Sequence, residues 1–118
     1  MKNQEKLDVI QKGIDETLIC RCHFTYDDNY RYYYPNAVND KFMLGQEELD
    51  FLLDGYCICK ISQIKKVEVR DDKCGEINRK RGLTKEVVMP AVDITSWKTI
   101  FESLKALDRF IFRLPYSS

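Results

Sequence analysis

Two pairs of cysteines, each separated by a single residue, are the residues of this chain best suited to chemistry. Cys20 and Cys22 lie beside His23, and Cys57 and Cys59 form the second pair. Thiolate and imidazole groups are the ligands that zinc prefers in proteins. The sharpest hypothesis is therefore a four-thiolate zinc site with His23 nearby.

Strand geometry argues against this zinc site. Residues two apart on a strand point to the same side, but they sit roughly 6.6 Å apart. Zinc–sulfur bonds of about 2.3 Å at tetrahedral angles require sulfurs roughly 3.8 Å apart. Cysteine is also a small residue that packs well in a hydrophobic core. We therefore expect no metal and no cofactor, and we interpret the four thiols as core residues.

A thiol enzyme is the next hypothesis, because Cys22 and His23 are adjacent. Neighbouring residues of a strand face opposite sides, so His23, the only histidine, cannot activate Cys22. Cys74 follows Lys73 near a turn and is the thiol expected to be most exposed and reactive. The sequence thus predicts no catalytic residue and no enzyme, and a zinc- or thiol-dependent protein stays the third alternative.

Tyrosines are concentrated in one short stretch, residues 26–34, and such rings can stack on the bases of single-stranded RNA. The same rings would serve a protein interface equally well. The interaction surface predicted from these tyrosines and from downstream basic residues consists of Tyr30, Tyr32, Tyr34, Lys65, Lys66 and Arg70.

Charge is balanced over the whole chain but not along it. The 118 residues include 19 basic and 19 acidic side chains, which disfavours a protein built to bind nucleic acid. Residues 25–56 hold two basic and seven acidic residues, whereas residues 60–85 hold nine basic and four acidic ones. Either the two segments form faces of opposite sign that suit self-association or an oppositely charged partner, or they pair as neighbouring strands.

The first half of the chain changes from a helical period to a strand period. Apolar residues at positions 7, 10 and 14 predict a helix, whose last turn Gly13 weakens. Alternation predicts strands over residues 17–25, 30–34, 41–45, 56–61 and 64–69, with Pro35 at an edge or a bulge and Asp54-Gly55 at a tight turn. Five short strands after a helix favour a small, strongly bent barrel.

The last third of the chain reads differently. Residues 74–81 predict a short charged helix that ends at Gly82. An amphipathic helix begins near a Thr95 or Ser96 cap and places Trp97 on its packing face. A final strand is expected at residues 110–114, and strand edges of this kind can pair with another copy.

Cysteine usage and hydropathy indicate the compartment. The count of five cysteines is odd, and the first residues contain no apolar stretch typical of a signal peptide. No apolar run approaches the roughly 18 residues needed to span a bilayer. We therefore expect free thiols, a cytoplasmic protein and no membrane association.

Two stretches resemble small uncharacterised bacterial proteins with an Sm-like β-barrel. Residues 54–72, DGYCICKISQIKKVEVRDD, look like the core of that barrel, and residues 96–105, SWKTIFESLK, are similar to the helix that follows it. The resemblance implies a fold and a bacterial origin, but it implies no activity.

Taken together, these patterns predict an α+β protein. We expect an N-terminal helix and a five-stranded, strongly bent Sm-like barrel within residues 1–72, and a C-terminal helix and strand packed on it within residues 73–118. No specific function can be read from these residues. The expected role is that of a non-catalytic protein-interaction or regulatory module, with another protein or a second copy as its partner, and the alternative is an RNA-binding Sm-like protein.

Overall fold

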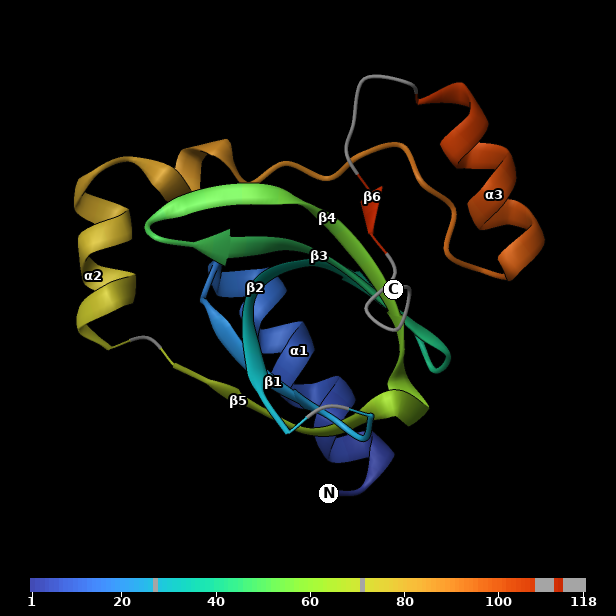
Figure 1. Ribbon diagram of the computed structural model, residues 1–118, viewed down its shortest axis with the longest axis horizontal. Helices are drawn as coiled ribbons and strands as arrows, with labels where there is room; N and C mark the ends of the chain where they lie inside the picture. The colour runs from blue at the N-terminus through green and yellow to red at the C-terminus, as the bar shows by residue number, and fades with distance from the viewer. Residues whose placement is uncertain (27, 71, 108–111, 114–118) are drawn as a thin grey trace.

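The computed structural model describes residues 1–26, 28–70, 72–107 and 112–113 (Figure 1). In chain order its elements are α1 (Asn3–Glu16), β1 (Cys20–Phe24), β2 (Tyr30–Val38), β3 (Phe42–Leu49), β4 (Leu52–Lys60), the 3₁₀ helix η1 (Ile61–Gln63), β5 (Ile64–Val69), α2 (Lys73–Lys80), the 3₁₀ helix η2 (Leu83–Glu86), α3 (Trp97–Ala106) and β6 (Phe112–Arg113). The expected α+β class is confirmed.

A single sheet holds the described strands, in the order β5-β1-β2-β3-β4-β6. Neighbouring strands pair antiparallel, except that β6 pairs parallel to β4. The sheet curves, and α1 packs against the residues on its concave side (Figure 1). The polypeptide therefore builds its main core between the inner face of one curved sheet and one helix.

The prediction of a five-stranded barrel is wrong, because the sheet does not close. Among the described residues β5 pairs only with β1, and no ladder joins β5 to β4. The turn η1 carries the chain from β4 to β5 without pairing them. The edge of β4 that closure would use is instead occupied at Tyr56 and Cys57 by β6. The sheet is therefore open.

Alternation in β1 and β4 places sulfur atoms inside the curve. Cys20, Cys22, Cys57 and Cys59 are each at most 4% exposed and belong to one core cluster. Ile10 of α1, which is fully buried, covers the same cluster. The prediction that the four thiols are core residues is confirmed.

The opposite face of β3 and β4 carries a second core cluster beneath α3. Phe42 and Ile58 from the strands pack there with Ile100 of the helix. Ser96 begins α3 with a capping box, because its Oγ accepts the Thr99 N–H at 3.2 Å and its own N–H donates to Thr99 Oγ1 at 3.0 Å. The helix predicted from the Ser96 cap is confirmed.

The tight turn between β3 and β4 is Asp50-Phe51, not Asp54-Gly55 as expected. Asp50 and Phe51 have positive φ angles of 51° and 65°. A two-residue hairpin of this kind normally selects Asn-Gly or Asp-Gly, so a phenylalanine here hides the turn from sequence rules. Gly55, with φ of 85°, instead lies inside β4 where the register of the β3–β4 pair shifts.

Pro35 lies at a bulge, which is one of the two positions that the sequence predicted for it. The register of β2 with β3 shifts between Pro35 and Ala37. Although β2 is an interior strand, its ladder with β1 ends at Tyr33 and does not reach the proline. The imide nitrogen is therefore tolerated inside a strand with two neighbours.

The C-terminal third packs on the sheet. The helix predicted at residues 74–81 is confirmed as α2, and the Asp72 carboxylate caps it by accepting the Cys74 N–H at 3.1 Å. The strand predicted at residues 110–114 is described only as β6, and its other positions lie outside the described residues.

The acidic and basic segments are not neighbouring strands. Lys60, the last residue of β4, pairs with Phe42, but the rest of the basic segment contributes only β5 to the sheet, whose pairing is with β1, whereas the acidic segment contributes β2, β3 and the first half of β4. The explanation of the charge pattern by strand pairing is thus wrong for the described ladders.

Gly13 is required for the close approach of α1 to the sheet. A Cβ at this position would lie 2.8 Å from Cys20 Sγ and 2.9 Å from Pro35 Cγ. Helix propensity favours alanine over glycine by about 1 kcal/mol, but overpacking a tight core contact costs about 1–3 kcal/mol.

We predict that Gly13→Ala lowers the free energy of unfolding by about 1–2 kcal/mol, against its helix propensity. Urea unfolding followed by circular dichroism measures the change. Lys12→Ala, at the exposed neighbouring position, is the matched control and should change stability by less than about 0.5 kcal/mol. A stabilised Gly13→Ala protein would contradict the packing described above.

Candidate functional site

Alternating residues of β5, β1 and β2 form a polar and aromatic face on the side of the sheet opposite the main core. The strand register places Arg21 between Tyr32 and Glu68, and His23 between Tyr30 and Lys66. We call this surface the tyrosine–cation face, and it consists of Arg21, His23, Tyr30, Tyr32, Lys66 and Glu68.

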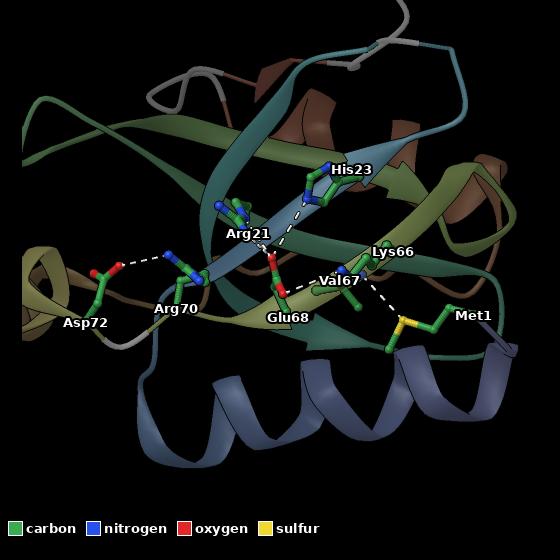
Figure 2. Close-up of polar contacts among 8 residues, drawn as sticks. All are labelled: Met1, Arg21, His23, Lys66, Val67, Glu68, Arg70 and Asp72. Atoms are coloured by element: carbon green, nitrogen blue, oxygen red, sulfur yellow. Dashed lines mark hydrogen bonds and ion pairs between the residues drawn. The ribbon is translucent and has the colours of Figure 1, made fainter.

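Glu68 is the centre of the charges on this face (Figure 2). Its carboxylate accepts hydrogen bonds from Nε of Arg21, at 2.7 Å, and from Nη2 of the same guanidinium. Lys66 Nζ lies 3.8 Å and His23 Nε2 lies 3.9 Å from the same carboxylate. The hydrogen bond from Arg21 lowers the pKa of Glu68, so the carboxylate stays ionised beside its cations.

Tyr30 is the exposed aromatic centre of the face. Its side chain is 47% exposed, yet three neighbours orient its ring. Arg21 Cζ lies 4.9 Å from the ring centroid, Tyr32 meets the ring edge-on at 5.6 Å, and His23 lies at 5.5 Å. The face therefore presents a large aromatic side chain that is exposed but already positioned.

Tyr34 does not belong to the predicted interaction surface, which is a correction. It follows Tyr30 and Tyr32 on the same side of β2, but its side chain is only 1% exposed. Leu83 packs on it, and its hydroxyl accepts a hydrogen bond from Asn78 Nδ2 at 3.1 Å. Tertiary packing by α2 and η2 therefore removes one end of the tyrosine row from the surface.

The basic residues predicted for the surface are only partly brought together. Lys66 lies on the tyrosine–cation face, whereas Lys65 lies at the bulge where the β1–β5 register shifts. Arg70 follows the end of β5 and pairs with Asp72 at 3.5 Å (Figure 2). On the outer edge of β5, the Val67 N–H donates to Met1 Sδ at 3.5 Å. Arg21 and Glu68 were missed, because nothing local distinguishes them from solvated strand residues.

The four core thiols form no reactive or metal-binding centre within the described part of the chain. No group of three or more potential metal ligands lies together there. Burial raises the pKa of Cys20 to about 12 and raises the pKa of Cys22 and of Cys59 well above the usual value. His23 lies on the opposite face from Cys22, as the strand alternation predicted.

Cys74 is the least buried of the five thiols, as expected, but it is not activated. Its Sγ lies 3.0 Å from the Glu48 carboxylate, to which the thiol donates. Burial and this neighbouring carboxylate raise the pKa of Cys74 to about 12. We expected Cys74 to be reactive, but its surroundings disfavour the thiolate form that reaction requires.

A pocket of about 290 Å³ lies between the tip of the β3–β4 hairpin and the start of α2. Glu48 is only 6% exposed at its wall and accepts from Asn78 Nδ2 at 2.8 Å. We call this the hairpin pocket, and it is lined by Tyr32, Glu48, Leu49, Asp50, Phe51, Asp72 and Cys74. Its lining combines carboxylates with aromatic and aliphatic side chains.

A second pocket, of about 350 Å³, lies between α3 and the loops at the other end of the sheet. Trp97 meets Phe42 edge-on at 4.9 Å, and Lys60 Nζ lies 5.9 Å from the indole centroid. We call this the tryptophan pocket, and it is lined by Asn3, Asp40, Lys41, Phe42, Lys60, Ser62 and Trp97. Trp97 thus packs on the sheet, as expected of its helix face, and also lines a pocket.

Thiol reactivity tests the environment of Cys74. A pKa of about 12 reduces the thiolate fraction at pH 8 by roughly three orders of magnitude relative to an ordinary cysteine. We predict that the native protein reacts slowly with DTNB. The Glu48→Gln variant should react at least about tenfold faster than the wild type, because the substitution removes the negative charge next to Cys74. Cys74→Ser identifies the reacting thiol, and rapid labelling of Cys74 in the wild type would contradict the geometry.

Comparison of the chain with models of known protein families, with curated proteins and with solved structures found no match. Among the described residues, no helix combines the length and the apolar character needed to cross a membrane.

Proposed function

We propose that this protein is a non-catalytic protein-interaction or regulatory module and that the tyrosine–cation face is its contact surface. The observation that carries the proposal is the exposed Tyr30 ring, which Arg21 and Tyr32 hold in one orientation. Tyrosine and arginine are the residues most enriched at the energetic centres of protein interfaces. A positioned side chain also loses less conformational freedom when a partner covers it.

The charges of the face favour a protein partner over a polyanion. Arg21 and Lys66 both point at Glu68, and Arg70 is paired with Asp72. Phosphate backbones bind best to cations without carboxylate neighbours, because each contact must replace counterions. Paired charges of this kind give specificity at a protein interface, where they select complementary partners.

The arrangement of elements supports the Sm-like part of the proposal. A helix precedes the strands, and the order β5-β1-β2-β3-β4 brings the last strand of the set beside the first. Curvature of this sheet gives a concave core and a convex outer face. We propose an Sm-like, strongly bent sheet that has been left open, which serves as a rigid support for the contact surface.

Affinity capture tests the contact surface. Immobilised wild-type protein should retain a specific partner from a lysate of the source cells, and Tyr30→Ala should lower retention about tenfold or more, as expected for a central aromatic contact. Phe101→Ala is the matched control, because Phe101 is a similarly exposed aromatic residue on α3. Equal retention by the wild type and Tyr30→Ala would overturn this assignment of the face.

A second candidate function, binding of single-stranded RNA, is favoured by the tryptophan pocket. Its wall offers the Trp97 indole for stacking, and the ammonium groups of Lys41 and Lys60, which outnumber the Asp40 carboxylate in the lining, can contact phosphate. The pocket lies away from the tyrosine–cation face, so the two functions are separable by mutation.

Fluorescence of Trp97, the only tryptophan, reports on this pocket directly. If RNA is bound there, oligo-uridine will quench the emission at low salt, and Lys60→Gln will reduce the salt slope of log K by about one. Lys12→Gln on α1 is the charge-matched control. Unchanged fluorescence, with no binding at low salt, removes RNA from consideration.

A further inference from the structure

The tyrosine–cation face and the hairpin pocket are parts of one continuous surface. Tyr32 joins them, because its ring contacts Tyr30 on one side and lines the hairpin pocket on the other. Leu49, which lines the hairpin pocket beside the turn, carries this surface to the tip of the hairpin. We call the whole surface the bipolar patch, because its two ends differ in charge.

One end of the bipolar patch is basic. Arg21 and Lys66 flank the Glu68 carboxylate there, which leaves an excess of one positive charge in this cluster, and exposed Asp28 lies at its margin two residues before Tyr30. Lys65, exposed at the neighbouring bulge, adds a further cation at the margin.

The other end is acidic. Glu48, Asp50 and Asp72 line the hairpin pocket, and Arg70 is the cation paired with Asp72. Asp50 is exposed at the hairpin turn and has no ion pair within the described part of the chain. Lys73, exposed beside Asp72, is a second cation, so the three carboxylates outnumber the two cations at this end.

Exposed apolar groups accompany the charge at both ends. Tyr30 is 47% exposed at the basic end, while Leu49, which lines the hairpin pocket, is 54% exposed at the acidic end. Large apolar side chains at this exposure, next to charges, are typical of a surface that another protein covers.

We propose that the bipolar patch binds a second copy of this chain around a two-fold axis near Tyr32. A two-fold axis places the basic end of one copy on the acidic end of the other, and it repeats the same contact in reverse. Tyr30 of each copy then meets Leu49 of its partner. This proposal rests on the proposed function and names the partner of the contact surface.

The charge pattern selects this arrangement over other ways in which the patch could meet itself. With the two copies turned the same way, like charges would lie opposite one another, which costs free energy. Antiparallel docking brings opposite charges together at both ends of the patch. The contact also closes on itself, so the expected product is a dimer and not a filament.

Charge reversal provides the decisive experiment. Sedimentation velocity over a concentration series should show a monomer–dimer equilibrium for the wild type. Lys66→Glu and Asp50→Lys should each raise the dimer dissociation constant about tenfold or more, since each substitution affects two symmetric contacts. The double variant should restore dimerisation, because the two ends have exchanged their charges.

Controls separate the interface from folding. Asp50→Asn tolerates the positive φ of the turn and should weaken the dimer less than Asp50→Lys does. Lys12→Glu on α1 should leave the equilibrium unchanged. The thermal unfolding of each variant is compared with that of the wild type, and a loss of dimer is interpreted only for variants that are folded.

Other results would overturn the proposal. A wild type that stays monomeric excludes a second copy as the occupant, and a dimer insensitive to both reversals lies elsewhere on the molecule. Species larger than a dimer contradict the two-fold axis. The capture experiment with Tyr30→Ala separates the dimer proposal from the proposed contact surface. If the wild type is monomeric but retains a partner that Tyr30→Ala does not retain, only the dimer is contradicted. If the wild type is monomeric and retains no partner in a Tyr30-dependent way, the proposed function is contradicted as well.

Discussion

Burial of the inner faces of β1 and β4 in one core is the constraint on which the rest of the structure depends. The two strands are separated in the sheet by β2 and β3, yet Cys22 of β1 and Cys57 of β4 belong to the same cluster. A flat sheet would hold them more than 10 Å apart, since each neighbouring strand adds about 4.8 Å. The sheet must therefore curve, and small thiol side chains leave room for that curvature. Curvature then makes the tyrosine–cation face convex and accessible.

Local sequence patterns correctly predicted the elements whose residues show the usual strand alternation or helix cap. Alternation identified β1 and β4, each with two of the four buried sulfurs, and the Ser96 cap identified the start of α3. The hairpin turn was misplaced, because Asp50-Phe51 adopts a left-handed geometry that phenylalanine rarely takes, while Asp54-Gly55 carries the usual turn signature inside a strand. Residue type therefore pointed to the wrong position for the turn.

The candidate site was less accessible to sequence reasoning for a related reason. Tyr30, Tyr32 and Lys66 were identified by residue type alone, but the burial of Tyr34 depends on Asn78, which is 44 positions away in the sequence. The importance of Arg21 arises from its register opposite Glu68, which no single strand reveals. Both pockets also join distant segments, so their linings exist only once the chain has folded.

The four buried thiols make the protein sensitive to oxidation once the sheet opens. While the sheet stays folded, protonated thiols excluded from water resist oxidants, because attack requires the thiolate. Opening the sheet would release all four at once, in two closely spaced pairs, into a solvent where air forms mixed and intermolecular disulfides. Such crosslinks would prevent the curve from forming again. The useful lifetime of the molecule in solution would then be set by its opening rate and by the available reductant, and not by its equilibrium stability.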